Sequence, residues 1–175
     1  MRIVAGSCKG ARIFSPKGRA TRPTSDRVRE ALFQLLGPID GAAVLDLFAG
    51  SGALGLEALS RGAASAVFVE SDRDAVGTIE RNVEKLGLPG ASVIRSDALR
   101  FLGAEEARYD LVFVDPPYEL VESLRMPLAK HLPDVLASTG VLVFETAATV
   151  EPALPLTVRA SRRYGSTRVT IFEAQ

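Results

Sequence analysis

Two short motifs contain the residue types that could do chemistry. In the first, residues 43–55, an apolar run containing Asp46 is followed by a turn with Gly50, Gly52 and Gly55. Glycines let the backbone approach a ligand closely, and the start of the following helix offers N–H groups to an acceptor. The motif therefore predicts a cradle for a nucleotide-containing cofactor.

Asp46 indicates which kind of cofactor the cradle suits. The spacing Gly50-x-Gly52-x-x-Gly55 also fits a dinucleotide fingerprint. A carboxylate at the end of the first strand would repel a pyrophosphate, whereas it attracts a ligand that carries a positive amino group. The residues favour S-adenosylmethionine over NAD, and the bland alternative is a tight turn that binds nothing.

The second motif is Asp115-Pro116-Pro117-Tyr118, directly after the apolar run 109–114. Consecutive prolines fix the backbone and leave carbonyl groups outside the strand ladder. The Asp115 carboxylate and the Pro116 carbonyl can each accept a hydrogen of an exocyclic amine, which localises the lone pair on its nitrogen. Tyr118 offers a flat face to a flipped base. The motif indicates methyl transfer to a base nitrogen through positioning and electrostatics.

The elements that position these motifs alternate along the chain. Apolar runs predict parallel strands at 43–47, 65–70, 91–95, 109–114 and 140–145, with helices near 24–36, 53–61, 72–86, just after Asp97, and 120–136. Runs near 156–163 and 167–173, joined by a tight turn, predict an antiparallel pair. Residues 2–5 and 11–15 predict a β-hairpin with a five-residue loop.

Ligands of an open parallel sheet bind at the carboxyl ends of its strands. Glu70 ends the second predicted strand, where a carboxylate can hold the two hydroxyls of a ribose. Asp97 follows the third strand and could accept from an adenine amino group, while the Ala98 N–H could meet a ring nitrogen. These residues should lie beside Asp46 and Asp115.

Charge is distributed unevenly although the net charge is zero. Residues 1–36 hold eight basic and two acidic side chains, a net charge of +6, and the rest of the chain holds 13 basic and 19 acidic ones. A basic segment on an acidic body predicts RNA binding, and a merely solvated arm is the alternative. The candidate RNA-binding residues are Lys9, Arg12, Lys17, Arg19, Arg22 and Arg27.

Composition excludes several other functions. The 175 residues, 47% hydrophobic and 24% charged, suit one globular domain. We expect no transmembrane helix, no signal peptide and a reducing, cytoplasmic environment for the lone Cys8. With only His131 and Cys8 to offer, no metal site is expected.

Taken together, the motifs resemble a known family. Leu45 to Gly52 with Asp115 to Tyr118 is similar to class I S-adenosylmethionine-dependent N-methyltransferases. The segment Thr21 to Phe33, the opening Arg2 to Gly6 and Tyr164-Gly165 resemble the bacterial RsmD family. That family methylates N2 of a guanine in 16S rRNA of the small ribosomal subunit.

The resemblance implies an α/β, three-layer αβα Rossmann-like fold. Its seven-stranded, mostly parallel sheet would have the order 3-2-1-4-5-7-6, with strand 7 antiparallel. Residues 1–20 would form a basic N-terminal β-hairpin extension and residues 21–175 the methyltransferase domain. The chain would act as a monomer on an assembled or assembling small subunit.

The resemblance also implies roles for residues. Asp115, Pro116, Pro117 and Tyr118 would hold the guanine, while Arg22 and Thr24 would help to close the site. The expected cofactor-binding residues are Arg22, Thr24, Asp46, Phe48, Gly50, Gly52, Glu70, Asp97, Ala98 and Asp115.

Three rival functions stay open at this point. A DNA adenine-N6 methyltransferase would use the same Asp-Pro-Pro-Tyr chemistry, although such enzymes usually carry a separate target-recognition domain. A non-catalytic RNA-binding assembly factor with a vestigial cofactor fold is the second. An NAD-dependent dehydrogenase is the third, and Asp46 disfavours it.

Overall fold

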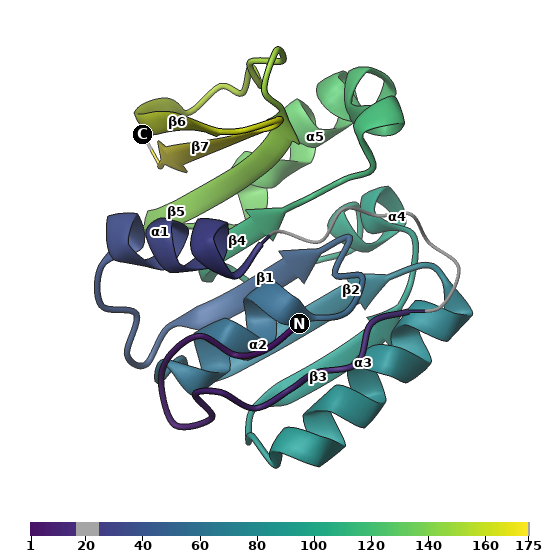
Figure 1. The fold of residues 1–175 in the computed structure, drawn as a ribbon. Coiled ribbons are helices and arrows are strands. Elements are labelled where there is room, and N and C mark those ends of the chain that lie inside the picture. Colours follow the sequence, from purple (N-terminus) through teal and green to yellow (C-terminus); the bar gives the residue numbers. More distant parts are fainter. Residues whose placement is uncertain (17–24, 175) are drawn as a thin grey trace.

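A single twisted sheet of seven strands organises the chain (Figure 1). The computed structural model describes residues 1–16 and 25–174. The strand order is β3-β2-β1-β4-β5-β7-β6; β7 pairs antiparallel with β5 and with β6, and the other pairs are parallel. This confirms the predicted sheet. The strands are β1 (Ala43–Leu47), β2 (Ser65–Glu70), β3 (Ala91–Arg95), β4 (Tyr109–Val114), β5 (Leu136–Ala147), β6 (Thr157–Tyr164) and β7 (Thr167–Glu173).

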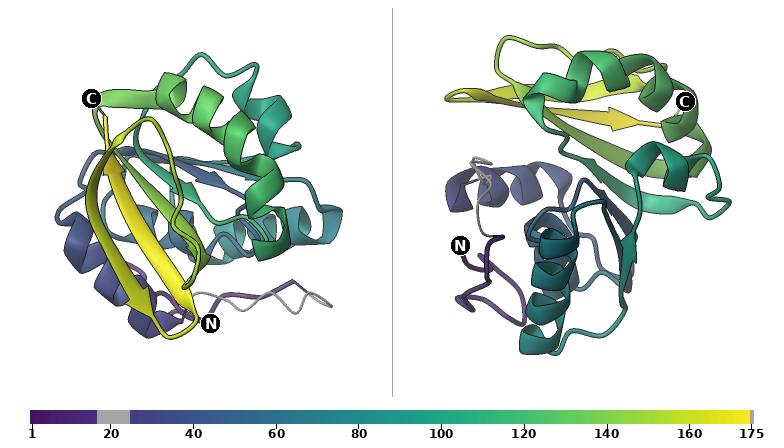
Figure 2. Two further views of the ribbon diagram at one scale, coloured as in Figure 1. Left: turned by 90° about the horizontal axis from the view of Figure 1, so that it is seen from above. Right: turned by 90° about the vertical axis from the view of Figure 1, so that its right-hand side faces the viewer.

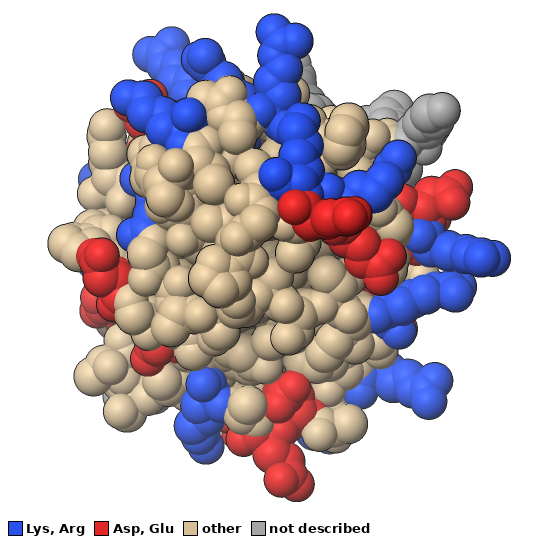
Figure 3. Space-filling view, turned by 90° about the horizontal axis from the view of Figure 1, so that it is seen from below, with Lys and Arg blue, Asp and Glu red and all other residues tan. Residues whose placement is uncertain are grey.

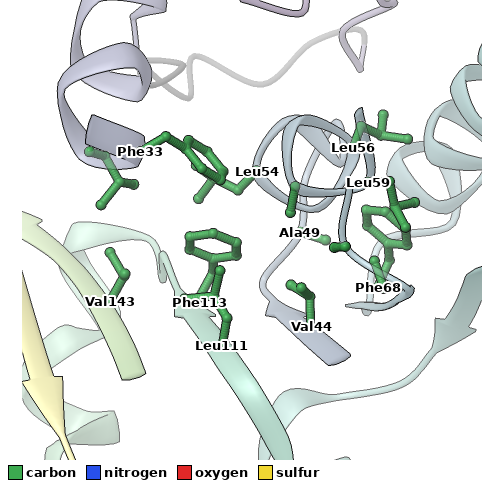
Figure 4. Packing of buried hydrophobic residues seen from close by; sticks show 14 of the residues in the cluster. Phe33, Val44, Ala49, Leu54, Leu56, Leu59, Phe68, Leu111, Phe113 and Val143 are labelled. Carbon is green, nitrogen blue, oxygen red and sulfur yellow. The ribbon is translucent and has the colours of Figure 1, made fainter. Parts of the chain in front are cut away.

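Helices cover both faces of the sheet, as Figure 2 shows from the side. On one face α1, α2 and α3 enclose a core in which Phe33 of α1 and Leu54 of α2 lie over Phe113 and Val143 of the sheet (Figure 4). On the other face α4 and α5 enclose a second core. The helices are α1 (Asp26–Leu36), α2 (Ala53–Ser60), α3 (Arg73–Leu86), α4 (Ala98–Leu102) and α5 (Val121–Val135), with a 3₁₀ turn, η1 (Tyr118–Leu120), before α5.

The helix boundaries follow capping chemistry. The side chain of Ser25 accepts the N–H of Val28 at the start of α1, and Asp72 accepts the N–H of Ala75 at the start of α3. Gly37 ends α1, as the sequence predicts. The strand β5 is longer than its predicted 140–145, because Leu136 already pairs with Tyr109 of β4 and the pairing with β7 continues to Ala147.

The predicted N-terminal hairpin forms only in part. Residues 1–13 turn back on themselves, but a single antiparallel bridge, Arg2 to Arg12, replaces the two predicted strands. The reason lies in two buried side chains of the helices beneath. Glu57 of α2 accepts the N–H groups of Val4 and Ala5, at 2.7 and 2.9 Å, so these groups are not used in a strand ladder.

The second side chain is Asn82 of α3, which bonds to both backbone groups of Phe14. Its Oδ1 accepts the Phe14 N–H at 2.7 Å, and its Nδ2 donates to the Phe14 carbonyl at 3.0 Å. Ile3 and Ile13 are buried in the core that α1, α2 and α3 enclose. The N-terminal segment is therefore built into the domain, and the predicted boundary between residues 20 and 21 lies outside the described residues.

Glu57 gives a test of this attachment. It is fully buried, and Arg61 donates to it from the next turn of α2 at 2.8 Å. The change Glu57→Ala leaves two backbone N–H groups and a guanidinium without their acceptor, so the free energy of unfolding should fall by about 2–4 kcal/mol. Urea unfolding measures this. Glu80→Ala, which removes an exposed acid of α3, is the control and should change stability by less than about 0.5 kcal/mol; equal effects would contradict the role of Glu57.

Candidate active site at the carboxyl ends of the strands

Four acidic side chains lie at the carboxyl ends of four adjacent strands. Glu70 ends β2, Asp46 lies near the end of β1, Asp115 follows β4 and Glu145 lies near the end of β5. Side chains alternate between the two faces of a strand. In every case the residue two positions earlier belongs to the core under α1, α2 and α3, so all four acids point to this one face. We call them the acidic row.

The glycine-rich turn lies between β1 and α2, at one end of the acidic row. Gly50 and Gly52 have φ values of 57° and 78°, in the left-handed region that glycine adopts without strain. Phe48 has a φ of 61° and is the only non-glycine residue at positive φ in the described part of the chain. A residue with a side chain keeps this conformation only where the surrounding structure holds it there. α2 begins at Ala53, and Gly52, the residue before it, has no side chain with which to cap the N–H groups of the first turn.

Asp46 ties this turn to the strand. Its side chain is almost fully buried, and its Oδ2 accepts the N–H of Gly55 at 2.9 Å. Burial raises the pKa of Asp46 to about 7, while the Gly55 N–H lowers it and the nearby Glu70 carboxylate raises it. A Cβ at residue 55 would lie 2.4 Å from the ring of Phe68, so only glycine lets α2 come this close.

Glu70 holds the other side of the glycine turn. Its Oε2 accepts the N–H of Gly50 at 3.0 Å, and its Oε1 accepts the N–H groups of Ser71 and Asp72, both at 2.9 Å. Glu70 is buried. The strand end, the glycine turn and the start of α3 are thereby fixed relative to one another.

Asp97 and Ala98 lie at the start of α4, next along the same edge. Asp97 caps the helix by accepting the N–H of Arg100 at 3.0 Å. Its side chain is exposed, whereas Ala98 is buried. The predicted adenine-contacting pair is thus placed just beyond the end of β3, on the strand next to Glu70.

The Asp-Pro-Pro-Tyr motif lies on the opposite side of Asp46 from Glu70. Asp115 follows the pair Val114–Phe144, which places it beside Glu145 on β5. Burial raises the pKa of Asp115 well above its ordinary value, and the carboxylates of Glu145 and Asp46 raise it further. Asp115 keeps part of its surface exposed, so it can be reached from outside the protein.

Tyr118 is held by the last hairpin of the sheet. Its hydroxyl lies 2.9 Å from the hydroxyl oxygen of Thr167, the first residue of β7, and 39% of its surface is exposed. The bond fixes one end of the side chain. The ring is therefore presented at the site rather than packed inside the domain.

Sequence reasoning missed Glu145. It ends an apolar run on β5 in the way that Asp46 and Asp115 end theirs, and this repetition was the signal that could have found it. The predicted residues Lys17, Arg19, Arg22 and Thr24 lie outside the described residues. Lys9, Arg12 and Arg27 are exposed and lie away from the acidic row, on residues 1–16 and α1.

Neither a metal site nor a membrane-spanning helix is found in the described part of the chain. No group of three or more His, Cys, Asp or Glu side chains there is arranged to hold a metal ion. Among the same residues, no helix has the length and apolarity needed to cross a membrane.

The chain is similar to known proteins over nearly its whole length. A family model described as Conserved hypothetical protein 95 matches residues 1–173. Ribosomal RNA small subunit methyltransferase D of Escherichia coli (strain K12) is 41% identical over 152 residues, which cover 86% of this chain and 74% of that protein. A Bacillus subtilis (strain 168) protein, provisionally named rRNA methyltransferase YlbH, is 40% identical over 185 residues, 99% of this chain and 98% of that one. A solved structure of a protein provisionally described as methyltransferase yhhF from Escherichia coli has a TM-score of 0.86 and 36% identity, covering 100% of this chain and 98% of that chain.

Asp46 gives the site a testable pH dependence. Its folded-state pKa of about 7 lies above the ordinary value of 3.8. The stability that the neutral form contributes is thus fully present below pH 3.8 and is lost as the pH rises through about 7. Between about pH 4 and 7, urea unfolding of Asp46→Asn should show a shallower fall in unfolding free energy than the wild type, by up to about 1.4 kcal/mol per pH unit.

The matched control for this test is Asp110→Asn. Asp110 is an exposed acid of β4 that accepts the N–H of Ala43 at 2.8 Å, outside the acidic row. Its variant should keep the wild-type slope. Parallel curves for wild type and Asp46→Asn would contradict the raised pKa.

Proposed function

This chain belongs to the Conserved hypothetical protein 95 family, the RsmD family, and we propose that it transfers a methyl group from S-adenosylmethionine to N2 of a guanine in small-subunit rRNA. One observation carries the proposal. Asp46 with its glycine turn, a site for a donor, and Asp115 with its two prolines, a site for an acceptor amine, lie on neighbouring strands and point to the same face. Donor and acceptor would therefore meet over the same part of the sheet.

The residues at the glycine turn fit S-adenosylmethionine. The left-handed turn at Gly50, where a Cβ would come no closer than 3.9 Å to another atom, and the start of α2 would offer room and N–H groups to the methionine end. The ionised form of Asp46 would supply a negative charge for its amino group. Glu70 would accept from the ribose hydroxyls, and Asp97 and the Ala98 N–H would meet the adenine. Arg22 and Thr24, outside the described residues, are proposed to help to close the site. When bound, the cofactor supplies an electrophilic methyl group on a sulfonium.

The residues around Asp115 would prepare the base. The carboxylate of Asp115 and the carbonyl of Pro116 accept the two hydrogens of the guanine N2 amine, so the nitrogen lone pair is no longer spread into the ring. Pro117 fixes the turn, and the ring of Tyr118, tethered to Thr167, stacks on the base. The N–CH₃ bond would form as the bond between the methyl group and the sulfonium sulfur breaks, which leaves a neutral thioether, and the amine proton would pass to the Asp115 carboxylate.

Glu145 supports guanine over adenine as the substrate. It places a second carboxylate beside Asp115 at the end of the adjacent strand. Guanine carries the N1–H and the N2 amine side by side, both of them donors, whereas adenine presents a bare acceptor at N1. Two ionised carboxylates would complement the two donors of guanine, whereas a pair that holds a proton could also donate to N1 of adenine. The preference for guanine therefore requires that both groups be ionised when the base is bound.

We further propose the setting in which the chain works. The substrate would be 16S rRNA in an assembled or assembling small subunit, and the protein would act in the cytoplasm as a monomer. The exposed Lys9, Arg12 and Arg27 would meet the RNA phosphates, together with Lys17, Arg19 and Arg22, which lie outside the described residues.

The assignment of Asp115 is tested by methyl transfer. Small subunits from cells that lack this protein are incubated with labelled S-adenosylmethionine, and the modified nucleotide is located. We expect N2-methylguanine with the wild-type protein. Asp115→Ala should lower kcat by about a hundredfold or more, while calorimetry shows an unchanged cofactor affinity. The exposed Asp134 of α5 provides the control Asp134→Ala, which should behave as wild type.

Each alternative has its own signature in this experiment. Label in naked duplex DNA and none in ribosomal particles would indicate the adenine methyltransferase. No binding of S-adenosylmethionine by the wild type would indicate a non-catalytic assembly factor. Equal loss of activity and of cofactor binding in Asp115→Ala would refute the role given to Asp115.

The RNA-binding role is tested through salt. Lys9→Gln with Arg12→Gln removes two exposed cations of the N-terminal segment. Each phosphate contact contributes roughly 0.7–0.9 to the slope of log affinity against log salt concentration, so the double variant should show a slope that is smaller by about 1.5. Filter binding to 16S rRNA between about 50 and 200 mM salt measures it. An unchanged slope would remove these two residues from the interface.

A further inference from the structure

One large aromatic side chain of the N-terminal segment is left at the surface among cations. Phe14 is 46% exposed, and its ring lies against α3. The Nζ of Lys85 is 4.6 Å from the ring centroid and the Cζ of Arg81 is 5.5 Å from it. Both distances are within the range of a cation–π interaction. An aromatic ring flanked by cations is the arrangement on which proteins stack single-stranded bases.

The position of Phe14 is fixed by its backbone. Asn82, which is fully buried, bonds to both the N–H and the carbonyl of Phe14. The same Nδ2 also donates to the carbonyl of Ser51 in the glycine turn, at 3.0 Å. A buried amide thus connects the exposed ring to the cofactor cradle. Ordering this residue costs conformational entropy, and the hydrogen bonds from Asn82 offset that cost.

A row of basic residues runs along α3 next to this ring. Arg73, Gly77, Arg81 and Lys85 follow one another at four-residue spacing, so they share one line on the helix surface. Arg81 is held along this line, because its Nε donates to the Gly77 carbonyl and its Nη2 to the hydroxyl of Thr78, both at 3.1 Å. Figure 3 shows Lys and Arg side chains gathered along the upper and right-hand margins of the face seen from below.

Gly77 lies inside α3, in the middle of this basic row. A glycine inside a helix destabilises it relative to alanine, and here its φ is not in the left-handed region. A Cβ at this position would meet no atom within 4 Å, so packing among the described residues does not require glycine. The position lies in a shallow, open hollow on the surface of α3, beside Arg73, Asp74, Thr78 and Arg81. Glycine in such a place suits a close approach by something outside the chain.

We propose that Phe14 and the basic row of α3 bind a single-stranded segment of the substrate RNA, outside the site of methyl transfer. One base stacks on the exposed face of Phe14, and the neighbouring phosphates lie along Arg73, Arg81 and Lys85, with the backbone closest at Gly77. The identity of the RNA rests on the function proposed above. The binding surface itself rests on the geometry of α3 and Phe14.

The acidic neighbours on α3 fit this arrangement. Asp74 borders the hollow, and Glu80 and Glu84 lie on the same helix, one position before Arg81 and Lys85. Residues one apart on a helix point in different directions, by about 100°. The acids therefore flank the basic row rather than interrupt it, and they would limit how far the RNA spreads across the helix.

The test compares two charge reversals that are chemically identical. Lys85→Glu places an acid in the proposed surface, and Lys130→Glu places one on the exposed side of α5, across the sheet. Binding to 16S rRNA is measured by filter retention, and KM and kcat are measured with small subunits that lack the modification. We expect Lys85→Glu to weaken binding and to raise KM about fivefold or more, with cofactor affinity unchanged. Lys130→Glu should behave as wild type.

Three further substitutions separate stacking and close approach from general packing. Phe14→Trp keeps a flat ring and should retain RNA affinity, while Phe14→Leu should lose about fivefold or more. Gly77→Ala should raise the melting temperature, because alanine favours the helix, and at the same time weaken RNA binding. A role in folding alone would predict a raised melting temperature with unchanged binding.

The outcomes distinguish this inference from the proposed function. Equal effects of Lys85→Glu and Lys130→Glu, or full RNA affinity in Phe14→Leu, would refute the proposed RNA-binding surface. This holds even if the wild type methylates the subunit. If the wild type binds 16S rRNA but transfers no methyl group, the proposed function is wrong. The RNA affinities of the variants, measured by filter binding, would still show whether Phe14 and the basic row of α3 bind RNA.

Discussion

The hydrogen bond from the N–H of Gly55 to the buried carboxylate of Asp46 is the contact on which the site depends. It joins the end of the first strand to the first helix, and it requires that residue 55 have no side chain, since the ring of Phe68 occupies that space. The side of α2 that faces away from the sheet is buried as well. Glu57 and Ser60 there bind the backbone of residues 4–8. The same helix therefore places the cofactor cradle and fastens the N-terminal segment.

Much of this arrangement could be predicted from local patterns. The apolar runs and the turns between them predicted the helices and strands closely, and the acids at the strand ends indicated where Asp46, Glu70 and Asp115 would meet. The hairpin was the main error, because strand formation at residues 2–5 depends on groups far along the chain. Glu57 and Asn82 take the backbone bonds that a ladder would have used. A single sequence offers no local signal for such long-range capture.

Acidic and basic side chains lie in different parts of the molecule, although its net charge is zero. Acidic side chains are concentrated inside, in the acidic row, where burial and neighbouring carboxylates disfavour ionisation and raise the pKa values of Asp46 and Asp115. Basic side chains lie outside, on residues 1–16 and in one row along α3 that acidic residues of the same helix flank. A cationic ligand in the row would relieve the repulsion among its carboxylates, whereas a pyrophosphate would increase it. This difference is the physical ground for preferring a sulfonium donor with a free amino group to a dinucleotide.

Asn82 connects the two regions through direct contacts. Its amide binds Phe14 on the outer surface and Ser51 in the glycine turn, and it is fully buried between them. A buried amide that lost one of these partners would keep an unsatisfied polar group, so its contacts on the two sides support each other. The proposed RNA surface and the cofactor cradle consequently share one rigid link. An RNA segment that rests on Phe14 is thereby placed relative to the glycine turn by only a few covalent and hydrogen bonds, which is the kind of fixed distance that in-line transfer to one chosen nucleotide requires.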